Sequence, residues 1–155
     1  MKNLGHYLAC LSVTAWVGSL WAIGYLATPV LFYAQPDRQL AGLLAGELFV
    51  RVGYLGMICG GYLLGYHLAQ SGRAAWRSGS FRVIAGMLMI SLIIQFGFQP
   101  VMSELKASVA TPDVVDSAAA AKFKILHGLS SIAYLIESLL GIYLVVTRQE
   151  FPQGK

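Results

Sequence analysis

The sequence has little charge for its length. Only 12% of its 155 residues are Asp, Glu, Lys or Arg, whereas a soluble domain typically has about 25%. Hydrophobic residues make up 57% of the chain, and its mean hydropathy is +0.65. These values exclude an ordinary soluble domain and indicate an integral membrane protein.

The chain also lacks the sequence motifs of common soluble enzymes. It has no phosphate-binding loop, dinucleotide fingerprint or nucleophile elbow. It has no Cys-x-x-Cys motif and no histidine pair at i,i+4, which metal sites often use. Its two cysteines, Cys10 and Cys59, lie in apolar runs, and we interpret them as small buried hydrophobic residues. We therefore assign no catalytic residue from the sequence.

The positive net charge does not indicate a nucleic acid partner. The net charge is +4 and the pI about 9.2, but the basic residues are scattered among loops. Basic loops beside membrane spans account for this pattern. We expect the lipid bilayer, and no nucleic acid, as a partner.

Four long apolar runs are present instead. They cover about 4–33, 40–69, 81–103 and 121–147, and each exceeds the roughly 20 residues that cross a bilayer. The first run is longer than the roughly 7–15 apolar residues of a signal peptide, so we expect it to remain as a membrane span. The sequence predicts an all-α integral membrane protein, a four-transmembrane-helix bundle, with residues 1–155 forming one domain.

The connecting loops are expected at 34–39, 71–80 and 106–121, and their charges predict the orientation. Six basic residues lie on the side of the termini, namely Lys2, Arg73, Arg77, Arg82, Arg148 and Lys155. Four lie on the other side with the acidic residues Asp37, Glu104, Asp113 and Asp116, namely Arg38, Lys106, Lys122 and Lys124. Because basic residues favour the cytoplasmic side, we predict a bacterial inner (cytoplasmic) membrane protein with both termini in the cytoplasm.

Glycine is concentrated in the second run. Gly56 and Gly60 are four residues apart, and so are Gly61 and Gly65. Small residues at this spacing allow close helix packing in membranes. We expect a close contact of this helix, either within the bundle or with a second copy or another membrane protein.

Polar residues form stripes within the apolar runs. Ser91, Gln95 and Gln99 share one face of the third helix, and His127, Ser131, Tyr134 and Ser138, with Ser130 and Glu137 adjacent, form a stripe on the fourth. We expect these two stripes to face each other. Glu47 and Arg51 can form an i,i+4 ion pair on the second helix. The predicted intramembrane polar cluster contains His127, Gln99, Gln95, Glu47, Arg51, Glu137 and Tyr134.

His127 has several interpretations. We expect it to form a buried hydrogen bond, with Gln99 or Glu47 as its partner. A role as a haem or metal ligand remains open, as does contact with a proton or a substrate. His6 and His67, expected at the cytoplasmic interface, are the other candidate ligands. Haem or copper is therefore an open cofactor alternative.

Glu137 is the costliest side chain to place in the membrane. A charged carboxylate near the bilayer centre is unfavourable unless it is protonated or paired. We expect its partner to be a Tyr or Ser hydroxyl on the first two helices, and its role can be structural or functional. Trp16 and Trp21 are expected in the core, and Pro29 is expected to bend the end of the first helix.

Several short motifs carry a family resemblance. They are WVGSLW (16–21), PVLF (29–32), AGLLAGELF (41–49), QP (99–100) and KFKILHGLS (122–130). Together they resemble a bacterial four-helix membrane family of unknown function that is related to eukaryotic transmembrane protein 205. The resemblance implies a four-helix membrane bundle. Because eukaryotic members are associated with resistance to platinum drugs, it also implies transport or trafficking.

A more distant resemblance concerns the first helix. His6 precedes Trp16 and Gly18 as a histidine precedes Trp-x-Gly in the copper-resistance D domain and the membrane protoporphyrinogen oxidase. The chain departs from the oxidase pattern because Val30 follows Pro29 where a basic residue is expected. This difference weakens the implication of a haem enzyme.

Three functional hypotheses follow. The first is a non-enzymatic transport or resistance component, or an accessory subunit of a membrane complex. The second is a haem- or metal-binding redox protein. The third is a proton- or ion-coupled transporter that uses the carboxyl group of Glu137.

Overall fold

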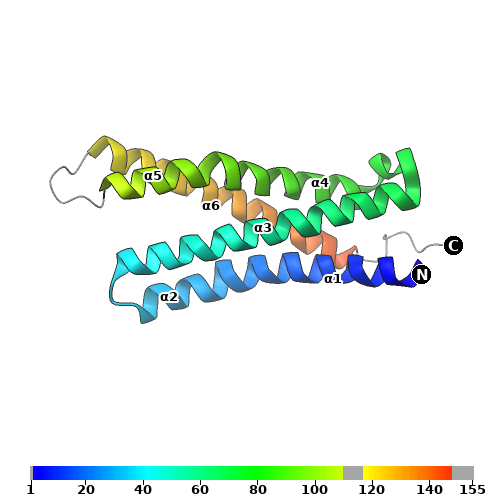
Figure 1. The fold of residues 1–155 in the computed structure, drawn as a ribbon, viewed down its shortest axis with the longest axis horizontal. Helices are drawn as coiled ribbons and strands as arrows, with labels where there is room; N and C mark the ends of the chain where they lie inside the picture. Colours follow the sequence, from blue (N-terminus) through cyan, green and yellow to red (C-terminus); the bar gives the residue numbers. More distant parts are fainter. Residues whose placement is uncertain (1, 110–116, 148–155) are drawn as a thin grey trace.

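The computed structural model describes residues 2–109 and 117–147. In these residues, four helical segments are long and apolar enough to cross a membrane, namely Leu4–Ala34, Arg38–Arg77, Gly79–Leu105 and Ala120–Val146. They lie side by side as an all-α bundle (Figure 1). The predicted four-helix membrane fold is confirmed, and the chain is a multi-pass membrane protein.

Three of these spans contain changes of helix type. The first consists of α1 (Lys2–Trp21), the π-helix η1 (Ala22–Ala27) and α2 (Thr28–Ala34). The second consists of α3 (Arg38–Ser71) followed by the 3₁₀-helix η2 (Gly72–Arg77). The third consists of α4 (Gly79–Leu92), the π-helix η3 (Ile93–Phe98) and α5 (Gln99–Val109), and the fourth is α6 (Ser117–Val146).

The connections are shorter than the sequence predicted. Between α2 and α3, the carboxylate of Asp37 caps α3 by accepting hydrogen bonds from the backbone N–H groups of Gln39 and Leu40, at 2.8 and 3.1 Å. The loop predicted at 71–80 is mostly the helix η2, and helix also occupies 106–109 and 117–121 of the loop predicted at 106–121. Alanine at 118–121 favours this helix extension. Asp113, Asp116, Arg148 and Lys155 lie outside the described residues.

The core is a seam of side chains at alternating spacings of three and four residues. On α1 the buried positions are Ala9, Val13, Trp16 and Leu20. On α3 they are Val52, Gly56, Cys59 and Leu63, and on α6 they are Glu137, Gly141 and Leu144. This spacing is typical of helices that cross at a small angle and interlock their side chains. Cys59 is buried and Cys10 half-buried, and both are free thiols as expected.

Trp16 and two glycines form the contact between α1 and α3. The Trp16 ring lies against Gly56 and Gly60, where an added Cβ would meet ring atoms. Gly61 and Gly65 instead face open space. The predicted close contact therefore lies within the bundle and involves the first glycine pair. Trp16 is fully buried, but Trp21 is 41% exposed, so the prediction of a core position for Trp21 was wrong.

Both π-helices precede a proline by the same interval. η1 ends two residues before Pro29, and η3 ends two residues before Pro100. Because proline has no N–H group and its ring crowds the carbonyl group four residues earlier, the local hydrogen bonds shift to an i→i−5 pattern. The N–H groups of Thr28 and Gln99 accordingly bond to the carbonyls of Ile23 and Ile94. The π-helix η1 lies directly before Pro29 and allows the first span to continue as a helix beyond this proline. The sequence did not predict this π-helix.

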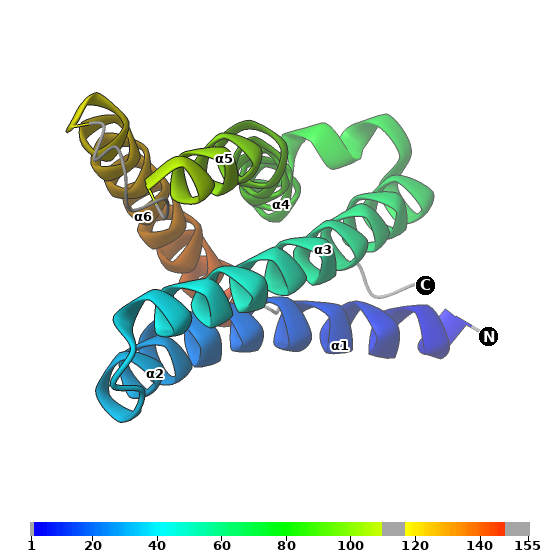
Figure 2. The same cartoon turned by 60° about the vertical axis from the view of Figure 1, so that its left-hand side comes forward.

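The two helical hairpins diverge at one end of the bundle. Figure 2 shows α2 and the start of α3 on one side of this end, with α5 and the start of α6 on the other. The start of α1 and the helix η2 lie at the opposite end (Figure 1). This divergence determines where the bundle has open space.

Candidate functional site: a cavity between two hairpins

A cavity of about 1330 Å³ lies between the diverging hairpins. Both π-helices contribute to its lining through Gly24 and Tyr25 of η1 and through Ile94 and Gln95 of η3. Aromatic and aliphatic side chains such as Phe32, Phe49, Leu43 and Val50 form much of the rest. Mostly apolar walls with a few convergent polar groups are typical of small-molecule sites.

Six residues of the predicted polar cluster line this cavity: Glu47, Gln95, Gln99, His127, Tyr134 and Glu137. Arg51 is not among its described lining residues. The lining also includes polar residues that the sequence analysis did not assign to the cluster, namely Thr28, Arg38, Gln39, Ser91, Ser103, Ser130 and Ser131. The sequence holds a signal for Thr28 as a lining residue. Thr28 directly precedes Pro29, just as the lining residue Gln99 directly precedes Pro100.

Glu137 and Ser91 form the deepest polar contact of the cavity. The Ser91 hydroxyl donates a 2.6 Å hydrogen bond to Oε1 of Glu137. Both side chains are buried, at 4% and 2% exposure. The Trp16 indole lies near the same carboxyl group, but its Nε1 does not reach hydrogen-bonding geometry. The partner of Glu137 therefore comes from α4, which corrects the expectation of a hydroxyl on the first two helices.

Tyr134 connects α6 to the first span. Its hydroxyl donates a 2.6 Å hydrogen bond to the backbone carbonyl of Leu20, and its ring lies against Gly24 of η1. Phe49 packs edge-on to the same ring, with 5.1 Å between the ring centroids. The polar stripe of α6 thus contacts two different parts of the bundle. Glu137 is hydrogen-bonded to α4, whereas Tyr134 is hydrogen-bonded to the first span.

Gln95 lies on the wall opposite α6. Its side chain is 7% exposed, and its Oε1 lies where a Cβ at position 53 would be, so a larger residue than Gly53 would require the carboxamide to shift. Gly53 thus makes room for the carboxamide of Gln95. The amide lines the cavity and offers both a donor and an acceptor to a bound molecule.

His127 is exposed on the cavity wall rather than buried in the bundle. Its ring stacks on Phe123 of the same helix, with centroids 5.8 Å apart and planes 9° apart. Its backbone carbonyl accepts hydrogen bonds from the hydroxyls of Ser130 and Ser131, at 2.9 and 2.8 Å. The prediction of a buried hydrogen bond from the His127 ring was wrong, because the hairpins separate at this level.

The other two histidines lie near the opposite end. Nε2 of His6 is 3.7 Å from Sγ of Cys10, one turn along α1. His67 is 1% exposed and contacts the rings of Tyr66 and Phe81, so it is a core residue rather than an interfacial one. Among residues 2–109 and 117–147, no group of three His, Cys, Asp or Glu side chains is close enough to hold a metal ion.

Glu47 and Arg51 form the predicted i,i+4 ion pair. Nη2 of Arg51 lies 3.4 Å from Oε2 of Glu47, and their side chains are 75% and 67% exposed. The pair lies on the outer surface of α3, where each charge neutralises the other. Glu47 thus lines the cavity with its charge paired to Arg51.

Comparison with known proteins identifies one matching family. No curated protein and no solved structure matches the chain. A family model, described as a domain of unknown function (DUF4149), matches residues 11–110. This range covers most of the first span, the second and third spans, both π-helices and the glycine contact with Trp16. The chain therefore belongs to the DUF4149 family.

Proposed function

We propose that this protein is a non-enzymatic transport or resistance component that binds a lipophilic small molecule in the cavity between its hairpins. The cavity of about 1330 Å³ carries this proposal. Its volume exceeds the roughly 300–1,000 Å³ of common ligand sites, so a drug-sized molecule fits. The resemblance to the family of transmembrane protein 205, whose eukaryotic members are associated with drug resistance, supports the same function.

The chemistry of the walls suggests how such a molecule would be held. Phe32, Phe49 and Leu43 provide apolar surface, whereas Gln95 and Glu137 provide hydrogen-bonding groups on the inner wall. A lipophilic molecule with one polar group matches this arrangement of apolar surface and hydrogen-bonding groups. Hydrogen bonds are strong in such a low-dielectric site, so even one polar group can determine the orientation of the bound molecule.

A variant with a large side chain inside the cavity tests this proposal. Ser131 lines the cavity on α6, whereas its neighbour Ile132 is 58% exposed and is not among the lining residues of the described chain. Ser131→Phe should therefore reduce the binding of a lipophilic fluorescent probe at least tenfold, and Ile132→Phe should not. The probe would be titrated into purified protein in mild detergent. Equal binding by both variants would overturn the proposal.

Proton coupling through Glu137 is a second candidate. The hydrogen bond between Ser91 and Glu137 supports it, because it places a carboxyl group at the inner wall of the cavity. Intramembrane carboxyl groups often participate in proton transfer. In reconstituted vesicles, Glu137→Gln should abolish substrate flux driven by a pH gradient but retain most of the probe binding, because the carboxamide keeps a hydrogen-bonding group at this wall. Unchanged flux in this variant would exclude the coupling role.

An absorption spectrum with elemental analysis separates these proposals from the redox alternative. His127 is exposed to the cavity and could coordinate a haem or a metal ion. A Soret band, or a stoichiometric metal that is lost in His127→Ala, would replace the transport proposal with a cofactor-binding function. A colourless, metal-free protein that binds the lipophilic probe would support the transport proposal.

A further inference from the structure

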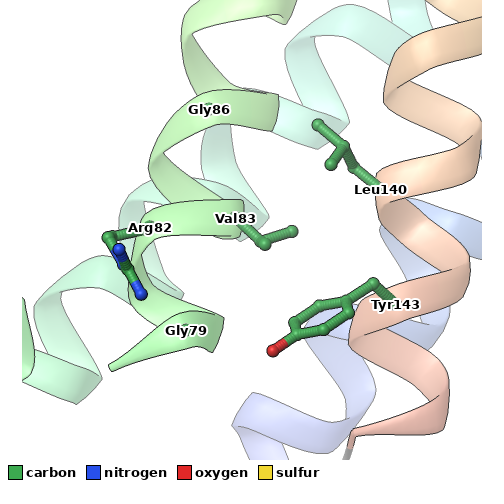
Figure 3. Close-up of a pocket in the computed structure, with 6 residues that line it drawn as sticks. All are labelled: Gly79, Arg82, Val83, Gly86, Leu140 and Tyr143. Atoms are coloured by element: carbon green, nitrogen blue, oxygen red, sulfur yellow. The ribbon is translucent and has the colours of Figure 1, made fainter. Parts of the chain in front are cut away.

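A second, smaller groove lies between α4 and α6, on the half of the bundle away from the large cavity. Its volume is about 310 Å³, and it is lined by Gly79, Arg82, Val83, Gly86, Leu140 and Tyr143. Figure 3 shows Val83 and Leu140 pointing toward each other across the groove, while the hydroxyl end of Tyr143 points toward the start of α4. One part of the groove is thus polar and the rest is apolar.

Small residues keep the floor of the groove open. An added Cβ at Gly86 would meet no atom within 4 Å. A methylene chain could therefore lie against Gly86 without meeting a side chain at that position. The groove lies at the surface of the bundle, between two spans that are long and apolar enough to cross a membrane.

The polar part of the groove carries the positive charge of Arg82, and within the described residues no acidic side chain forms an ion pair with it. Arg82 is exposed, and the sequence contains no Asp or Glu between Glu47 and Glu104. Within the described residues, the ion pairs include only that of Arg51 with Glu47. The guanidinium group of Arg82 can therefore bind an external anion.

Further positive charge lies in the adjoining segment. Arg73 and Arg77 belong to η2, the helix that leads into α4. Trp76 of η2 packs on Phe81 of α4, with 5.0 Å between the ring centroids, so η2 is held beside the first turn of α4. Basic residues concentrated at one end of a membrane bundle attract anionic lipid headgroups.

We propose that this groove is a binding site for an anionic phospholipid. The lipid phosphate would contact the guanidinium group of Arg82 and the hydroxyl group of Tyr143, and one acyl chain would lie along Val83, Gly86 and Leu140. Charge and shape both support this occupant, because Arg82 lines the groove together with the apolar residues. Figure 3 shows the Arg82 side chain on the side of α4 away from Val83, so the exposed guanidinium group would turn toward the bound phosphate. The proposal is independent of the function assigned to the large cavity.

Lipid retention by the full-length protein tests this site. Protein in mild detergent would be mixed with phosphatidylglycerol or phosphatidylcholine, and bound lipid would be counted by native mass spectrometry. Wild-type protein should prefer phosphatidylglycerol, and Arg82→Gln should weaken this binding about fivefold. Lys124→Gln is the matched control, because it removes one exposed positive charge from the other end of the bundle.

A second pair of variants tests the apolar part of the groove. Gly86→Leu should block the acyl chain and abolish the preference, whereas Gly65→Leu should not, although both positions face open space. Glycerol phosphate in place of lipid should not compete, since it lacks an acyl chain. Full competition by glycerol phosphate, or equal lipid binding by Arg82→Gln and Lys124→Gln, would overturn the proposal.

Discussion

The hydroxyl group of Ser91 donates a 2.6 Å hydrogen bond to the carboxyl group of Glu137, joining α4 to α6 within the membrane. Both side chains are nearly inaccessible, yet Glu137 also borders the large cavity. The contact thus links the packing of the bundle to the candidate ligand site. A carboxyl group in this position is costly unless it is protonated or has a partner, so Ser91 stabilises its placement.

Removal of this hydroxyl group should destabilise the bundle. Ser91→Ala leaves the carboxyl group of Glu137 without its donor and should lower the free energy of unfolding by about 1–3 kcal/mol. Unfolding in mixed detergent micelles, followed by circular dichroism, measures this change. Ser103→Ala is the control, because that hydroxyl bonds within its own helix, to the carbonyl of Pro100. Equal stability of the two variants would contradict the role of Ser91.

The glycines of α3 should differ sharply in their tolerance of alanine. At Gly56 an added methyl group collides with the Trp16 ring, so Gly56→Ala should lower the free energy of unfolding by about 1–3 kcal/mol. At Gly61 the methyl group enters open space, and Gly61→Ala should be neutral or slightly stabilising. The same unfolding measurement compares the variants. A similar loss at both positions would show that Gly61 is also covered, for example by a second copy.

Tyr134→Phe should loosen the attachment of α6 to the first span. The variant keeps the ring against Gly24 but loses the hydrogen bond to the Leu20 carbonyl, at a cost of about 1 kcal/mol. Tyr54→Phe is the matched control, since Tyr54 is 51% exposed on α3. Thermal unfolding in detergent should give a lower midpoint for Tyr134→Phe than for Tyr54→Phe. Identical midpoints would mean that the hydroxyl group of Tyr134 adds no net stability.

The orientation in the membrane is testable by cysteine labelling. In a background with Cys10→Ala and Cys59→Ala, Gln39→Cys marks the start of α3 and Ala74→Cys marks η2. An impermeant maleimide should label Gln39→Cys in intact cells and Ala74→Cys only after permeabilisation, because basic residues near η2 favour the cytoplasm. The reverse pattern would place both termini outside and contradict the charge-based prediction.

The sequence predicted the spans and some local contacts, since these depend on neighbouring residues. Runs of apolar residues determine which segments can cross a membrane, and the spacing of Glu47 and Arg51 along one helix determines their ion pair. Six residues of the predicted polar cluster line the same cavity, because residues on the same helix face point the same way. The consequence of Pro29 was missed, because a proline can bend a helix or shift its hydrogen bonds, and local sequence does not decide which.

The amino-acid sequence by itself determined the membrane class, the four helices and the polar stripe on each of two helices. Tertiary packing alone decided which stripe residues are buried. His127 and Glu137 lie ten residues apart on α6, yet His127 is exposed whereas Glu137 is only 2% exposed. That difference depends on how α6 crosses its neighbours, and the crossing is set by distant contacts such as Tyr134 with Leu20 and Val17 with Gly141.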